Sequence, residues 1–189
     1  MTKTKFSFLA IVMLAGLVAF SVTSCKKSSS SPTPTATLYD SLGGTVMVND
    51  PANNGTMIEK GRLTIRSVVD STIFVIAADT ALNGFFKVLL SEVTNGNFSG
   101  FQALSKNLTD FVCVGTGAKN FTYGGKSMVA AHDPAQNSRM NGKADNGDFT
   151  EFEVDLTLGA KKNGVPSTAP VFQSLARIVE SLRSQVVQM

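Results

Sequence analysis

The sequence has few of the residues that most metal sites and disulfide-stabilised folds require. It contains 2 cysteines, 1 histidine and no tryptophan in 189 residues. Two cysteines exclude a disulfide framework and any multi-cysteine zinc or iron–sulfur site, and one histidine excludes sites that need several imidazoles. Charged residues make up only 16%, but hydrophobic residues make up 43% and include 13 phenylalanines. This composition excludes a wholly disordered chain and allows one domain with a real core.

The N-terminus has the pattern of an export signal that ends in cysteine. Lys3 and Lys5 precede an apolar run over residues 6–22, and small residues follow up to Cys25. A basic start, a short apolar run and small residues at the cut are typical of a secretory signal peptide. The terminal cysteine resembles the bacterial lipobox, which implies cleavage before Cys25 and its lipidation. The alternatives are a plain signal peptide or an uncleaved membrane helix, for which the run is short.

The predicted processing also changes the charge of the chain. All 14 acidic residues follow Cys25, whereas Lys3 and Lys5 are removed from the 17 basic residues, which leaves 15 against 14 and a net charge of +1. This near balance predicts no nucleic-acid partner. We therefore expect a lipoprotein signal peptide at 1–24, a lipidated cysteine with a Ser/Thr/Pro tether at 25–36, and one folded domain at 37–189. The only cysteine in that domain, Cys113, lies in an apolar segment and is predicted to be buried.

Most of the predicted domain has helical periodicity, so we expect an all-α fold. A Thr37-x-x-Asp40 capping box predicts a short helix that ends at Gly43-Gly44. Residues 45–61 are rich in Asn, Gly and Pro and predict a loop. Apolar residues between 63 and 76 predict a long helix, although their β-branched character leaves a strand as the alternative.

Three further helices are predicted in the second half of the chain. Apolar spacing between 101 and 112 predicts a helix that ends at Gly115. Asp148 with Glu151 predicts the start of another helix, which ends near Gly164. Pro170 predicts the start of a last helix, whose apolar stripe continues to residue 186.

The only histidine lies in residues 123–132, YGGKSMVAAH. A lone histidine beside alanines and Asp-Pro is most often a surface or helix-end residue. No G-x-S-x-G nucleophile motif accompanies it, and a zinc site would need further ligands at matched spacing. Haem iron needs only one imidazole, because the porphyrin supplies the in-plane ligands. A helical, phenylalanine-rich domain with one histidine satisfies that requirement.

The pattern Tyr-x-Gly-Lys-Ser-Met-x-x-Ala-His resembles the proximal-histidine segment of the truncated haemoglobins, most closely group 1. Other motifs resemble that family in the same order along the chain: Leu38–Gly44, Val68-Val69-Asp70 with Ala78-Asp79, Phe85-Phe86, Leu108–Cys113 with Thr116-Gly117, and Asn163–Pro166. The resemblance covers roughly residues 38–188, with apparent insertions at 49–61 and around 87–99. It implies a truncated globin-like, two-over-two helical sandwich that holds haem b, with His132 as the proximal iron ligand.

The resemblance also implies roles for residues around the haem. Phe85 and Phe86 resemble the aromatic pair over the haem, and Tyr123 and Met128 are expected on the proximal side. Lys126 is expected near a haem propionate. From the residues alone, Tyr123 and Met128 are equally consistent with ordinary core positions, and Lys126 with a solvated surface position.

The expected distal side departs from the family. Thr72-Ile73 stands where the group often has Phe-Tyr, and Leu104 and Leu108 occupy the usual polar positions, with Asn107 between them. Ile73 and these leucines offer no hydrogen-bond donor to O₂, so we expect fast O₂ release or competing autoxidation. Asn107 is the candidate donor. We predict a largely five-coordinate ferrous haem.

The resemblance therefore predicts a gas-binding haem protein, with O₂, NO or CO as its ligand and an unidentified electron donor. The lipobox places it in the bacterial cell envelope, lipid-anchored on a periplasmic or outer-membrane face. One alternative is an enzyme that converts NO and O₂ to nitrate at the same haem. Another is a haem-free interaction lipoprotein with the same fold. The altered distal motif and the two insertions favour this alternative.

Overall fold

The computed structural model describes residues 35–189. The predicted signal peptide, Cys25 and most of the tether lie outside the described residues. The helices and strands follow one another in this order: α1 (Leu38–Ser41), β1 (Met47–Asn49), β2 (Met57–Glu59), α2 (Lys60–Ala78), the 3₁₀ turn η1 (Asn83–Phe86), α3 (Lys87–Thr94), α4 (Ser99–Gly115), α5 (Met128–His132), α6 (Asn146–Lys162), α7 (Pro170–Glu180) and α8 (Arg183–Val186). The all-α prediction is confirmed, with one small hairpin as the exception.

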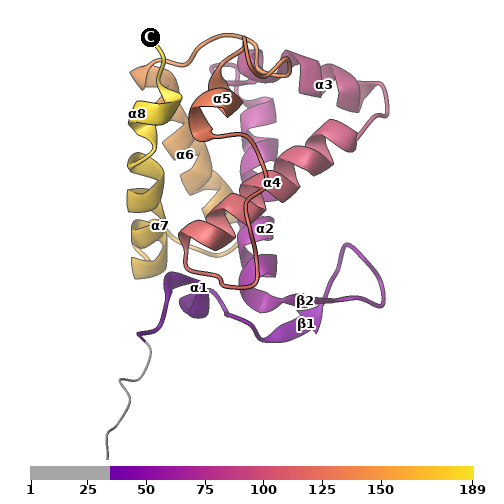
Figure 1. Cartoon of the computed structure of the whole chain (residues 1–189), viewed down its shortest axis with the longest axis vertical. Coiled ribbons are helices and arrows are strands. Elements are labelled where there is room, and N and C mark those ends of the chain that lie inside the picture. Colours follow the sequence, from indigo (N-terminus) through magenta and orange to yellow (C-terminus); the bar gives the residue numbers. More distant parts are fainter. Residues whose placement is uncertain (1–34) are drawn as a thin grey trace, which may run out of the picture. The chain divides into compact units, whose positions relative to one another are not determined.

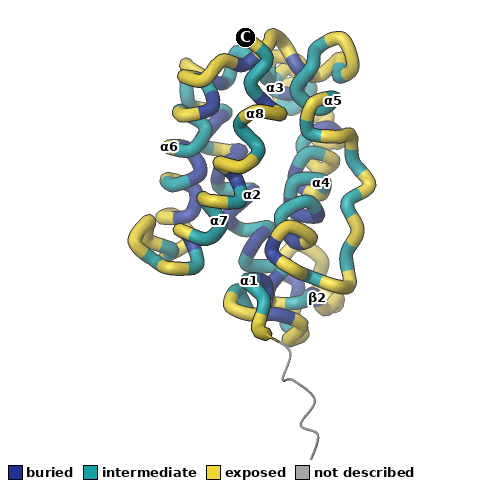
Figure 2. Tube along the Cα trace, turned by 60° about the vertical axis from the view of Figure 1, so that its left-hand side comes forward, coloured by how far each residue is buried: buried dark blue, intermediate teal, exposed yellow. Residues whose placement is uncertain are grey.

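The long helices of residues 35–189 are α2, α4, α6 and α7, and α2 is central among them. α2 has its most extensive contacts with α6 and α4, and α6 also contacts α7 (Figure 1). Gly159 of α6 allows α2 to approach closely, because a Cβ atom there would lie 2.8 Å from the backbone nitrogen of Thr72. Buried residues follow the facing sides of these helices in Figure 2 and form two apolar clusters. One cluster joins α2 to α6, α7 and α8, and the other joins α1, α2 and α4.

The ends of the helices follow their capping residues. At α1, Thr37 Oγ1 accepts a hydrogen bond from the backbone N–H of Asp40 at 3.1 Å, and Asp40 Oδ2 accepts one from Thr37 N–H at 2.7 Å, which confirms the predicted capping box. The predicted start of α6 is wrong. Asp145, rather than Asp148, is its N-cap and accepts from the N–H of Asp148 at 2.9 Å. The same i, i+3 spacing of two acids occurs twice in this segment, at Asp145 with Asp148 and at Asp148 with Glu151, and the earlier pair makes the cap.

The loop predicted at 45–61 is also wrong in part, because it contains a hairpin. β1 pairs antiparallel with β2, with Val48 opposite Ile58, and α2 already begins at Lys60. The residues rich in Asn, Gly and Pro form only the connecting turn, where Asp50 accepts the N–H of Ala52 at 2.9 Å. Strands of three residues are too short to give a detectable alternating pattern.

The last predicted helix is interrupted. α7 begins at Pro170 as expected but ends at Glu180, and α8 is a separate short helix from Arg183. No glycine or proline marks this break. The apolar stripe nevertheless continues across it, since Leu182 and Val186 both face the interior cavity.

Cys113 of α4 is fully buried, as predicted, and burial raises the pKa of its thiol to about 11. It therefore packs as a small apolar residue.

Within residues 35–189, no single helix is long and apolar enough to cross a membrane. The bent pair Lys60–Ala78 and Asn83–Thr94 meets that criterion only when its two parts are combined.

Candidate functional site

A cavity of about 380 Å³ lies between α2, η1, α4, α5 and the α6–α8 segment. This volume lies within the range of roughly 300–1,000 Å³ that is usual for small-molecule sites. All ten residues that the sequence predicted around the haem line it: Ile73, Phe85, Phe86, Leu104, Asn107, Leu108, Tyr123, Lys126, Met128 and His132. They come from four separate segments of the chain, and the fold brings these segments together around one cavity.

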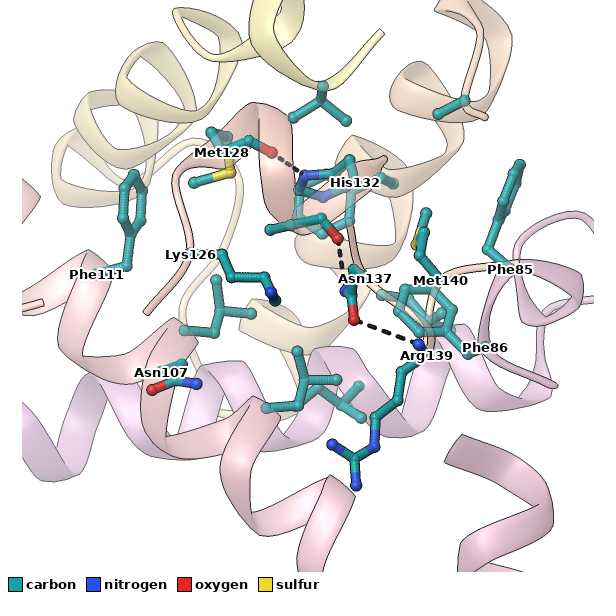
Figure 3. A pocket seen from close by; sticks show the side chains of 18 of the residues that line it. Phe85, Phe86, Asn107, Phe111, Lys126, Met128, His132, Asn137, Arg139 and Met140 are labelled. Carbon is teal, nitrogen blue, oxygen red and sulfur yellow. Dashed lines mark hydrogen bonds between the residues drawn. The ribbon is translucent and has the colours of Figure 1, made fainter. Parts of the chain in front are cut away.

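His132 is the last residue of α5, and its ring is held by that short helix. Ser127 caps the helix, because its hydroxyl oxygen accepts from the N–H of Ala130 at 3.3 Å. One turn later, His132 Nδ1 lies 2.8 Å from the carbonyl oxygen of Met128 (Figure 3). A carbonyl can only accept, so Nδ1 carries the proton and Nε2 keeps its lone pair. Among residues 35–189, Nε2 has no hydrogen-bond partner.

Burial favours the neutral form of the half-buried imidazole. Burial holds the pKa of His132 below its ordinary value, and the hydrogen bond to the carbonyl of Met128 opposes this only in part. A neutral imidazole with a free Nε2 is the form that binds transition metals. Met128 was expected only as a wall of the site. The i, i+4 spacing to His132 was the signal that its carbonyl could orient the ring.

The segment after α5 fixes that helix in place. Asn137 Nδ2 donates to the carbonyl oxygen of Ala131 at 2.7 Å, and Asn137 Oδ1 accepts from the N–H of Arg139 at 3.3 Å. From the C-terminal end, Gln188 donates to the carbonyl oxygen of Val129 at 3.1 Å. The sequence analysis missed Asn137, because no local pattern shows that an amide in this loop folds back onto the helix.

The wall opposite His132 is mostly apolar. Ile73 of α2 and Leu104 and Leu108 of α4 line the cavity there, and Asn107 lies on this side in Figure 3. Thr72 faces away, since its hydroxyl donates to the carbonyl oxygen of Val68 at 2.9 Å. The Asn107 side chain has no hydrogen-bond partner among the described residues, so its amide is available to a ligand.

Aromatic residues close the other sides of the cavity. Phe85 and Phe86 come from η1. Tyr123 packs edge-on against Phe111, with ring centroids 5.3 Å apart, and its hydroxyl donates to the carbonyl oxygen of Lys126 at 2.6 Å. The Tyr123 hydroxyl is thus occupied, and this residue acts as a wall.

Two cationic side chains lie at the edge of the cavity. Lys126 is exposed, and its ammonium group has no ion pair among residues 35–189. Arg139, which the sequence did not single out, is also exposed and pairs with Glu92 at 3.1 Å. Both cations lie at the edge of a mostly apolar cavity, and Lys126 is the one of the two without an ion pair among residues 35–189.

Further apolar residues line the cavity that the sequence did not single out as part of a site. They include Ile76, Leu82, Leu89, Met140, Phe149, Phe152, Val179, Leu182 and Val186. An apolar helix face that packs on a neighbouring helix has the same sequence pattern as one that lines a cavity. Only the assembled fold distinguishes the two.

The residues of this cavity fit haem. The donor set offers one neutral imidazole, which matches a metal whose other ligands come from its own macrocycle. The apolar walls suit a porphyrin face, and the cations at the edge suit its two carboxylates. The other cysteine or histidine ligands that zinc would need are absent from the cavity lining.

Comparison with known proteins identifies the architecture. No protein-family model matches the chain, and no curated protein matches it. Three solved structures of truncated haemoglobin from Tetrahymena pyriformis, all single-site mutants in the Fe(III) form, match with a TM-score of 0.56 and 21% identity. Each match covers 82% of this chain and 100% of that chain.

The fold is that of a truncated globin. The predicted two-over-two helical sandwich is confirmed, with α2 and α4 as one pair and α6 and α7 as the other. At this level of identity the likeness shows the fold alone. The group 1 assignment and the lipoprotein assignment stay predictions.

Proposed function

We propose that this chain binds haem b in the cavity, with His132 Nε2 as the proximal ligand, and binds a diatomic gas at the iron. The observation that carries the proposal is the only histidine of the sequence, which lies in an apolar cavity with its Nδ1 proton donated to Met128 and its Nε2 free. Support comes from the truncated haemoglobins of the same fold. Bound in this cavity, haem would supply an iron that can bind O₂, NO or CO.

The residues of the chain have separable tasks in this proposal. The Met128 carbonyl holds the His132 ring in one tautomer and raises its basicity toward a metal. Ile73, Leu104 and Leu108 exclude water from the opposite side without donating a hydrogen bond. Asn107 is the one amide donor on that wall. The cations Lys126 and Arg139 neutralise the carboxylates of the cofactor.

We also propose that the protein is attached to the bacterial cell envelope through lipidated Cys25. The signal-like segment and lipobox-like cysteine of the sequence support this. At that location the haem iron would need an electron donor on the same side of the membrane. We propose such a donor as a partner of this protein.

The test is to purify the protein, add haemin and record the Soret band and its stoichiometry. We expect one haem per chain. In His132→Ala the proximal nitrogen is lost, so haem affinity falls at least about tenfold and added imidazole restores the spectrum. Val129→Ala, an exposed neighbour on the same short helix, serves as the control and keeps the wild-type spectrum.

Two results would count against the proposal. An unchanged spectrum in His132→Ala shows that another residue holds the iron. A folded wild-type protein that takes up no haemin favours the haem-free interaction lipoprotein with a globin fold.

A further inference from the structure

Three carboxylates meet where α2 ends against α6, outside the haem cavity. Asp79 is the C-cap of α2, and Glu151 and Asp155 are one turn apart on α6. Each offers one oxygen atom, and these three oxygens lie within 4.8 Å of one another. The spacing of four residues places Glu151 and Asp155 on the same side of their helix.

The Asp155 carboxylate of this cluster is buried without a partner. Asp155 is 2% exposed, and its Oδ2 atom and the Oδ2 atom of Asp79 are both buried with no hydrogen-bond partner. Asp79 uses only Oδ1 locally, where it accepts from the N–H of Ala81 at 3.0 Å. Such groups cost free energy unless something compensates them.

The other buried acids of the domain show what compensation normally looks like. Asp50 pairs with Arg66, and Asp110 pairs with both Arg62 and Lys106. No ion pair among residues 35–189 involves the three carboxylates of the cluster. Asp155 is therefore the one buried acid in the described part of the chain that lacks a cationic side chain.

Electrostatics at this junction favour positive charge. Burial, followed by the negative charges of Asp79 and Glu151, raises the pKa of Asp155. The C-terminal end of α2 adds the partial negative charge of its last carbonyl groups. A bound cation would offset the cost of burying Asp155, the repulsion from Asp79 and Glu151, and the partial negative charge of the helix end.

We propose that Asp79, Glu151 and Asp155 bind a divalent cation of the calcium class. The ligands are all oxygens, which hard cations prefer, and Ca²⁺ accepts mixed carboxylate and water ligands at roughly 2.3–2.6 Å. Two oxygens on opposite sides of such an ion are about 5 Å apart, so the observed limit of 4.8 Å accommodates it. The ion ties the end of α2 to α6 just before the turn that carries Phe85 and Phe86.

The test is calorimetric titration of the EGTA-treated protein with CaCl₂, together with its thermal unfolding in CaCl₂ and in EGTA. We expect one Ca²⁺ per chain and a higher unfolding temperature with Ca²⁺. Asp155→Asn keeps the shape of the side chain, so it folds, but its Ca²⁺ affinity falls at least about tenfold. Glu180→Gln removes an exposed carboxylate already paired with Arg183 and leaves Ca²⁺ binding unchanged.

The two variants also separate cation binding from simple repulsion between acids. Because Asp155→Asn removes a buried charge, in EGTA it is at least as stable as the wild type. Absence of Ca²⁺ binding by the wild-type protein overturns the proposal and indicates a shared proton instead. Equal Ca²⁺ affinity in the wild type and Asp155→Asn overturns it as well. Neither measurement depends on haem.

Discussion

At the scale of single residues, the tautomer of His132 is set within the six residues 127–132. The cap at Ser127 starts α5, and the carbonyl of Met128, four residues before His132, receives its Nδ1 proton. This bond fixes the tautomer and directs the free lone pair of Nε2 away from its own helix. The chain thus makes the imidazole ready to bind a metal through local backbone geometry rather than through a carboxylate partner.

The leucines on the wall opposite His132 give a prediction at the same scale. Leu104→Gln is nearly isosteric and places an amide N–H on the cavity wall. A new hydrogen bond of about 1 kcal/mol corresponds to about a fivefold lower rate constant for O₂ dissociation. Stopped-flow mixing of the oxygenated protein with an O₂ scavenger measures this rate.

The matched control for this change is Leu104→Met. It keeps the size and apolar character of the side chain and adds no donor, so O₂ dissociation should stay near the wild-type rate. A Gln variant that is as fast as the Met variant would show that Leu104 does not face the ligand. The same comparison at Leu108 then tests the neighbouring position.

At the scale of helices and strands, the sequence predicted the long elements well and their ends less well. α2, α4 and the first part of α7 have apolar stripes that extend over several turns, and such periodicity is a strong signal. The hairpin of β1 and β2 and the break before α8 have no such signal. Their conformations depend on contacts with the rest of the fold, which a local pattern does not contain.

The approach of α2 to α6 gives a prediction at the element scale. In Gly159→Ala the new methyl group meets Thr72 of α2, whose backbone nitrogen would be 2.8 Å away. Backbone cannot give way as a flexible side chain can, so we expect a loss of about 1–3 kcal/mol in the free energy of unfolding. Urea unfolding followed by circular dichroism measures it.

Gly115→Ala, at the end of α4, is the control for Gly159→Ala. Its nearest contact would be Ile178 Cγ2 at an ordinary 3.7 Å, so alanine is accommodated and stabilises the chain by up to about 1 kcal/mol. If both variants were equally stable, the packing of Gly159 against Thr72 would not limit the distance between the helices.

At the scale of the whole molecule, the sequence predicted which residues meet but not everything that surrounds them. Ten expected residues line one cavity. They were predicted because family motifs in several segments of the chain imply which residues lie together in the fold. Asn137 and Arg139 were missed because a loop of polar residues has no periodicity from which to infer its contacts. The cluster at Asp79 was missed for a related reason, since it joins a helix end to a helix face 72 residues later, at Glu151.

The proposed anchor gives a prediction for the whole chain. Cys25→Ser removes the only thiol that the lipobox-like segment offers for lipidation, so we expect the protein to leave the membrane fraction. Its haem spectrum should not change, because Cys25 lies outside the compact unit from Thr35 to Met189. Cys113→Ala removes the other, buried cysteine and should stay in the membrane fraction. Cell fractionation with immunoblotting measures where each variant is found. If Cys25→Ser protein remains with the membranes, attachment does not depend on the lipid. An uncleaved N-terminal helix would give that result.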